Sequence, residues 1–206
     1  MTNTINPAAE KKIKNHVLMS IGIAAIPVPM LDYIMVYYIQ MDMIKQLSRI
    51  YHKPYYEMKG KAYIGALVST SLARMGASLI KGLPGVGSLM GTVSSVVLSG
   101  ASTYAVGRVT ARFLQDNIEL SDVDMDLAKS MFKEEFEKGK TVAKKLVEEK
   151  EAKKKQMSPD EVARQEAKEK DIYNQLARIK TLRAKNIITF EEYESLRLKY
   201  MKQLDL

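Results

Sequence analysis

Hydrophobic residues recur along this chain at spacings of three and four, and no segment alternates with the two-residue period of a strand. Proline and glycine separate the periodic stretches, which is typical of helix boundaries. In the first part of the chain the pattern predicts helices over residues 8–26, 30–51 and 56–81, and a fourth that runs from a turn at 82–85 to residue 116. The fold class expected from this pattern is all-α.

A long charged helix is predicted after the apolar part. It begins at Ser121 or Asp122, because acidic residues in this stretch suit a helix N-terminus, and it continues to about Gln156. Gly139 is expected to be a weak point within it, since glycine has a low helix propensity. Lysine and glutamate are interleaved along this helix, so we expect a solvated, charged surface.

Two capping motifs mark the last two helices. Ser158 suits an N-cap, with Pro159 at the first helical position and Glu161 at the third. Thr189 and Glu192 repeat the capping-box spacing before the final helix. Both helix starts are therefore predicted from local sequence.

These two helices are predicted to form an αα-hairpin that turns at Asn186, a residue that tolerates left-handed backbone. The single apolar face of the hairpin is too small to be stable alone, so we expect it to dock on a partner or on copies of the chain. The residues expected to make that contact are Ile179, Leu182, Ile188, Tyr193, Leu196 and Tyr200.

Charge is distributed unevenly along the chain. Residues 1–120 contain 12 Lys/Arg and 6 Asp/Glu, whereas residues 121–206 contain 20 and 18. This shift predicts a domain boundary near Ser121. We expect an apolar helical domain over 1–120, a charged helical connector over 121–157 and the hairpin within 158–206.

Residues 82–107 contain no Lys, Arg, Asp, Glu or His. The stretch is long enough for a bilayer-spanning helix, which needs about 20 apolar residues. Gly, Ser, Ala and Thr supply about half of it, and such small residues let two helices approach closely. The stretch is therefore predicted either to span a membrane or to be buried in a helical assembly. The residues expected to pack there are Gly87, Gly91, Ser95 and Ser99.

In a membrane hairpin, residues 62–80 would form the second arm. Arg74 interrupts that arm, and a central arginine costs at least about 2.5–3.5 kcal/mol on insertion scales. Positive residues flank the outer ends of the hairpin, which predicts that both ends are cytoplasmic. Asp32 and Asp42 lie on an otherwise apolar helix. We expect them to be exposed or to pair with Arg74, with ion ligation as the alternative.

Tyrosines gather in the same part of the chain. They suit either an aromatic belt at a membrane interface or ordinary helix packing with hydroxyls at the rim, and we favour packing. Seven of them lie within residues 33–63, at Tyr33, Tyr37, Tyr38, Tyr51, Tyr55, Tyr56 and Tyr63.

Composition argues against most enzyme chemistry. The chain has no Cys and only two His, which excludes thiol catalysis and makes a His-built metal site unexpected. The glycine-rich turn near residue 85 lacks the Gly-Lys-Ser/Thr ending of a phosphate loop. A net charge of +8 suggests an anionic partner such as lipid headgroups or nucleic acid. Glutamates interleaved with the lysines near residue 150 disfavour nucleic acid.

The C-terminal hairpin resembles the SHOCT module, a short helical hairpin found at the ends of many bacterial proteins. The resemblance covers about 30 residues and rests on Ile179, Leu182, the run 187–189, the run 191–193 and Leu198. Asn186 stands where that family usually has Gly. The resemblance implies a role in oligomerisation or targeting.

Residues 13–116 resemble the YcjF-type family, whose members often accompany small GTPase domains and are usually described as membrane proteins. The matching stretches are 26–32, 40–51, 83–87 and 103–108. The family often has Gly where this chain has Met30. The resemblance implies an all-helical, membrane-associated domain with a link to a separate GTPase, and it implies no catalytic residues.

We therefore predict a non-enzymatic, membrane-associated scaffold whose charged C-terminal half is cytoplasmic. It is expected to contact lipid, to self-assemble through small-residue helices and the hairpin, and to need no cofactor or metal. One alternative is a soluble cytoplasmic ring or shell. The other is a membrane channel or transport component in which Asp32, Asp42 and Arg74 face a polar path.

Overall fold

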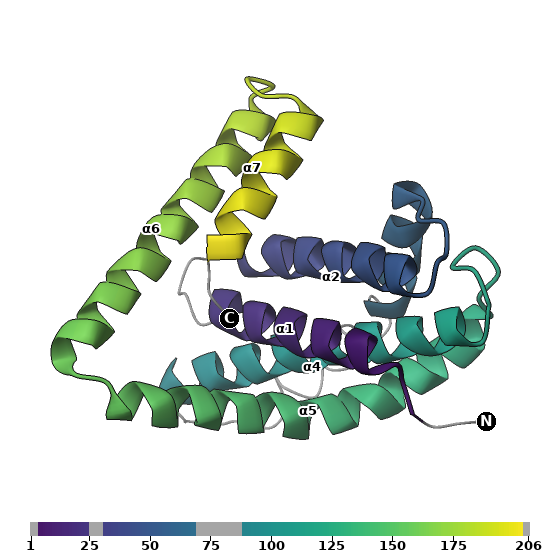
Figure 1. Cartoon of the computed structure of the whole chain (residues 1–206), viewed down its shortest axis with the longest axis horizontal. Coiled ribbons are helices and arrows are strands. Elements are labelled where there is room, and N and C mark those ends of the chain that lie inside the picture. Colours follow the sequence, from purple (N-terminus) through teal and green to yellow (C-terminus); the bar gives the residue numbers. More distant parts are fainter. Residues whose placement is uncertain (1–3, 25–30, 69–87, 204–206) are drawn as a thin grey trace. The chain divides into compact units, whose positions relative to one another are not determined.

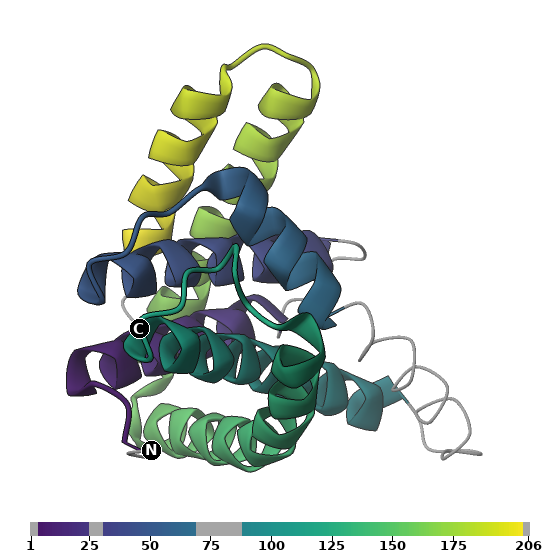
Figure 2. The same cartoon turned by 90° about the vertical axis from the view of Figure 1, so that its right-hand side faces the viewer.

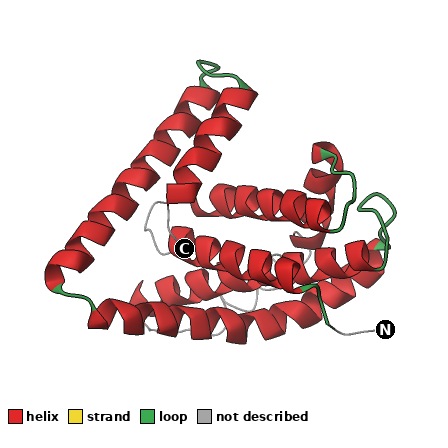
Figure 3. Cartoon of the chain, viewed as in Figure 1, coloured by secondary structure: helices red, strands yellow, loops and turns green. Residues whose placement is uncertain are grey.

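The computed structural model describes residues 4–24, 31–68 and 88–203 as helices joined by turns, with no strand in those ranges (Figures 1 and 3). This confirms the predicted all-α fold. A further helical segment covers 57–68. The remaining helices are α1 (Pro7–Ala24), α2 (Leu31–Ile50), α4 (Ser88–Gln115), α5 (Met125–Gln156), α6 (Pro159–Ala184) and α7 (Phe190–Gln203).

Helix ends follow local sequence closely. Ser158 is the N-cap of α6, and its hydroxyl accepts a hydrogen bond from the Glu161 N–H at 3.3 Å. The Ser158 N–H donates to the Glu161 carboxylate at 2.8 Å, which lowers the pKa of that carboxyl. The Thr189 N–H donates to Glu192 at 2.8 Å, and Asn186 adopts a φ of 54°. Both predicted capping boxes and the predicted turn are confirmed.

The chain divides into two compact units, Met1–Val147 and Glu148–Leu206. The division after Val147 lies further along the chain than the change in composition at Ser121. The first part of α5 belongs to the first unit because it buries one apolar face in the core of that unit, while its charged side chains lie on the opposite face. The buried residues on that face are Ala128, Phe132, Phe136, Gly139, Ala143 and Leu146.

The first unit is built around α1, α2 and α4, which pack side by side, with the first part of α5 on α4 (Figures 1 and 2). Burial of apolar side chains is the main force that stabilises such a helical layer. The largest fully buried side chains come from every helix of the unit and from residues 57–68. They are Ile13, His16, Val17, Ile39, Met43, Ile44, Leu47, Ile64, Leu67, Val106, Val109 and Phe132.

Glycines set the distance between these helices. A Cβ atom at Gly139 would lie 2.9 Å from the Ala101 carbonyl oxygen and 3.0 Å from the Ala101 Cα, so α5 and α4 touch through backbone. A Cβ atom at Gly107 would lie 2.8 Å from Ile13 Cγ1. The helix α5 is continuous through Gly139, where the absence of a side chain allows this close packing.

Described residues of the uncharged stretch 82–107 pack in the core of the first unit. Residues 82–87 lie outside the described residues, and the rest belongs to α4. Val96, Ala101, Ala105 and Val106 are buried in the core of the first unit. Across the described ranges, none of the helices combines the length and the apolar character needed to cross a bilayer.

The second unit contains the end of α5 together with the antiparallel pair α6 and α7, joined by a short turn (Figure 1). Ile172, Leu176, Ile179 and Tyr193 are buried. Of the other residues expected to contact a partner, Leu182, Ile188, Leu196 and Tyr200 are half-buried. The hairpin architecture predicted for this region is present.

Candidate functional site

A buried polar contact joins α1 to α2. His16, which is 2% exposed, places Nε2 at 3.1 Å from Asp42 Oδ2, and the Asp42 side chain is 11% exposed. The Gln46 amide donates to the same carboxylate oxygen at 2.6 Å. Arg74 was the partner predicted for Asp42, but it lies outside the described residues, and the structure places His16 beside Asp42.

The other ring nitrogen of His16 also faces an acceptor. Nδ1 lies 2.7 Å from the carbonyl oxygen of Lys12, one turn earlier in α1. A carbonyl oxygen accepts hydrogen bonds and does not donate them, and an ionised carboxylate behaves in the same way. Both ring nitrogens of His16 thus lie beside an oxygen, one within α1 and one across the interface with α2. The contact fixes the register of α1 against α2.

Replacing Asp42 by Ala should lower the free energy of unfolding by about 1–2 kcal/mol, because buried donors on His16 and Gln46 would lose their acceptor. Urea denaturation followed by circular dichroism measures the change. The double variant His16→Leu/Asp42→Leu should be less destabilised than the two single Leu variants added together. Strict additivity would contradict a coupled pair.

A second polar layer joins α1, α2 and α4 inside the core. The hydroxyls of Ser20 and Thr103, both fully buried, lie 2.7 Å apart. The amide of Gln40 donates to Ser102 at 3.2 Å and more weakly to Thr103 at 3.4 Å. Because buried polar groups are costly without partners, this layer favours one alignment of the three helices over shifted ones.

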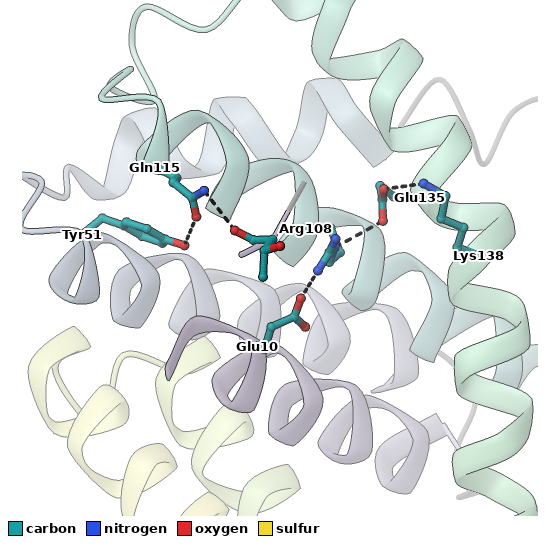
Figure 4. Close-up of polar contacts among 7 residues, drawn as sticks. Glu10, Tyr51, Arg108, Gln115, Glu135 and Lys138 are labelled. Atoms are coloured by element: carbon teal, nitrogen blue, oxygen red, sulfur yellow. Dashed lines mark hydrogen bonds and ion pairs between the residues drawn. The ribbon is translucent and has the colours of Figure 1, made fainter. Parts of the chain in front are cut away.

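Arg108 of α4 bridges α1 and α5 (Figure 4). Its guanidinium pairs with Glu10 of α1, and its Nε lies 3.4 Å from Glu135 of α5. Lys138 pairs with the other Glu135 oxygen at 2.9 Å. Arg108 and Glu135 are only 16% and 14% exposed, so solvent screens this network less than an ordinary surface pair. The network therefore links α1, α4 and α5 through the side chain of Arg108.

Two tyrosine hydroxyls form hydrogen bonds with residues of α4. The Tyr51 hydroxyl donates to Gln115 at 3.2 Å, and the Gln115 amide donates to the Thr4 carbonyl oxygen at 3.2 Å (Figure 4). Tyr63 is buried, and its hydroxyl accepts a hydrogen bond from Thr110 at 3.4 Å. Burial raises the pKa of Tyr63, which keeps its hydroxyl neutral. These two tyrosines act in packing, as the sequence analysis favoured.

The other predicted site residues fall in different places. Ser95 is exposed and Ser99 half-buried on α4, and Gly91 lies in the same helix. Asp32 is the second residue of α2, but its side chain, like Gly87 and Arg74, lies outside the described residues. The predicted helix-packing face and the predicted group of buried charges are therefore described only in part.

The polar pairs named above connect different helices of the first unit. Among the described residues, no group of three or more His, Asp or Glu side chains could hold a metal ion. Sequence reasoning missed His16 and Ser20. A signal for both existed, since they follow Ala9 and Ile13 on one face of α1 at helical spacing.

Comparisons with known proteins agree with this division of the chain. Residues 3–141 match the family described as "Domain of unknown function (DUF697)", which covers nearly all of the first unit. Over 140 residues the chain is 36% identical to "Magnetosome membrane protein 22" of Magnetospirillum gryphiswaldense, an alignment that covers 66% of this chain and 72% of that protein. No solved structure matches. Neither the YcjF-type nor the SHOCT resemblance is specifically supported by these matches. The chain belongs to the DUF697 family.

Proposed function

We propose that this protein is a non-enzymatic scaffold that associates with a membrane. The observation that carries the scaffold part is how the first unit uses its polar side chains. His16 with Asp42, Ser20 with Thr103, and Arg108 with its two glutamates all pair across helix interfaces. Side chains engaged in this way fix the packing of a rigid helical body and are not presented together to a substrate.

Two observations support the membrane part. The relative that shares 36% identity is named a magnetosome membrane protein, and the alignment with it covers 66% of this chain. Residues 1–147 carry 18 Lys/Arg and 12 Asp/Glu, and this excess of positive charge favours the anionic surface of a bilayer. Peripheral binding through a basic surface requires no helix that crosses the bilayer.

The second unit supports self-assembly as a further part of the proposal. Its hairpin exposes Ile187 at the turn, with 63% of the residue accessible, and keeps Leu182, Ile188 and Leu196 only half-buried. Such a face suits a second copy of the hairpin. In this proposal the charged second unit projects into the cytoplasm, as the positive residues that flank the predicted hairpin suggest. A separate GTPase partner stays a prediction of the YcjF-like resemblance.

Flotation with lipid vesicles tests the proposal. The full chain should rise through a density gradient with vesicles of phosphatidylcholine and phosphatidylglycerol in equal parts, and binding should weaken as salt is raised because the attraction is electrostatic. Mass measurement in the absence of lipid should give more than one copy per particle. Protein that stays at the bottom of the gradient at low salt would contradict membrane association, and a monomeric mass would contradict self-assembly.

A further inference from the structure

We propose that residues 56–65, at the start of the helical segment 57–68, form the surface through which this protein lies on an anionic bilayer. This inference rests on the proposed membrane association and identifies the part of the molecule that makes it. The occupant we assign to this surface is the headgroup region of a membrane that contains anionic lipids.

One face of the segment is buried in the first unit. Gly60, Tyr63, Ile64 and Leu67 are all buried, and they follow the spacing of three and four that defines one side of a helix. The segment is therefore fixed on the core along its length. Its opposite face must point to the surroundings.

That opposite face is apolar where a solvated helix would carry charge. Met58, Ala62 and Gly65 follow one another at spacings of four and three, and all three are exposed. Met58 is 84% exposed, the highest value among the exposed large hydrophobic residues. A soluble helix usually places charged side chains in the middle of its outer face.

Lysines flank this apolar stripe. At about 100° per residue, Lys59 lies roughly 100° to one side of Met58 and Lys61 roughly 60° to the other. Both are exposed. Lys61 pairs with Glu57 at 2.5 Å, whereas Lys59 forms no ion pair with a carboxylate of the described residues. An apolar stripe between basic side chains is the pattern of helices that lie in a membrane interface, where lysine stems extend to the headgroups.

An aromatic side chain completes the surface. Tyr56 is 55% exposed just before the helix, and the Lys59 ammonium lies 4.9 Å from the centre of its ring. Tyrosine is favoured at membrane interfaces because its ring is apolar and its hydroxyl is polar. Two of the exposed large hydrophobic residues thus lie within three positions of each other, beside lysines.

Contacts with the core of the first unit hold this surface in place. Tyr55 packs against the start of the helix, because a carbon of its ring would lie 3.1 Å from a Cβ atom at Gly60. The Tyr55 hydroxyl lies 3.9 Å from the sulfur of Met41 in α2. Tyr63 is buried against Thr110 of α4. A surface fixed before it meets lipid loses little conformational freedom on binding.

Substitution of Met58 by Asp tests the inference on the full chain. It places a negative charge in the middle of the stripe at a position that makes little contact with the core, so circular dichroism and thermal unfolding should be unchanged. Flotation with vesicles of phosphatidylcholine and phosphatidylglycerol in equal parts should fall by about tenfold or more, because an apolar contact is lost and a repulsive charge is added. Met58→Leu should keep the binding of the original chain.

Leu127→Asp is the matched control, since Leu127 is also a half-exposed hydrophobic residue of the first unit, in α5. It should leave flotation nearly unchanged. If the original chain floats and Met58→Asp floats equally well, this surface is not the contact, although the proposed membrane association survives. If the original chain does not float, both proposals fail. If Met58→Asp changes the mass of the particle in the absence of lipid and leaves flotation unchanged, the occupant is a second copy, which also overturns the inference.

Discussion

Replacing Phe132 by Ala should lower the free energy of unfolding of the first unit by about 3–5 kcal/mol. Phe132 is 1% exposed and stacks on Phe136, with ring centres 5.9 Å apart and an angle of 27° between the planes. Truncation to Ala removes the apolar contacts of the ring and leaves a cavity between α5 and the core. Denaturation in guanidinium followed by circular dichroism measures the loss as a shift of the midpoint.

The same helix supplies a control for this experiment. Leu127→Ala removes an exposed hydrophobic side chain only five residues earlier, and it should change the free energy of unfolding by no more than about 0.5 kcal/mol. Similar midpoints for the two variants would show that α5 is not anchored through Phe132. The first part of α5 would then belong with the charged connector, as the composition of the chain suggests.

Counting charged residues predicted a domain boundary at Ser121. Such a count does not separate the buried side of a helix from its exposed side. Counted together, the residues of α5 are mostly charged, and the helix resembles a solvated connector. Its apolar positions nevertheless recur at Ala128, Phe132 and Phe136 with the spacing of one face. Periodicity within α5 contained information that the charge count lost, because the buried face of the helix extends to Leu146.

Local and long-range features of the fold differ in how well sequence predicts them. Capping boxes involve residues three positions apart, so the pairs at Ser158 and Thr189 were visible in the sequence and are confirmed. The pair between His16 and Asp42 spans 26 positions, and the pair between Glu10 and Arg108 spans 98. Such partners depend on which helices meet, and a single sequence does not record that.

The small residues of α4 also show that sequence predicts a close contact more readily than it predicts the partner in that contact. Their spacing predicted that α4 approaches another helix closely, and Gly100 and Gly107 of α4 do so against Ile21 and Ile13 of α1. The residues chosen from sequence, from Gly87 to Ser99, precede this region. A stripe of small side chains indicates that a neighbour comes near, but it does not say which neighbour. The neighbour of Gly100 in α5 is Ala143, whose Cβ atom would lie 2.9 Å from a Cβ atom at Gly100. The contacts described here lie within one chain.

Replacing Gly139 by Leu should lower the free energy of unfolding by about 3 kcal/mol, at the upper end of the usual cost of overpacking. The first added carbon would lie 2.9 Å from the Ala101 carbonyl oxygen, and a backbone atom inside a helix cannot rotate aside as a flexible side chain does. The expected relief is a separation of α5 from α4, which also weakens the contact of Arg108 with Glu135. Denaturation followed by circular dichroism measures the loss, and mass measurement shows whether the assembly state changes.

Gly65→Leu provides the matched control, because a Cβ atom at Gly65 meets nothing within 4 Å and leucine has the better helix propensity. In the absence of lipid it should leave stability unchanged or raise it by up to about 1 kcal/mol. A loss of stability at Gly139 with unchanged particle mass would show that the close contact of α5 with α4 stabilises each chain by itself. A smaller particle at full stability would instead place Gly139 between copies, and it would contradict the packing of α5 on α4 within one chain.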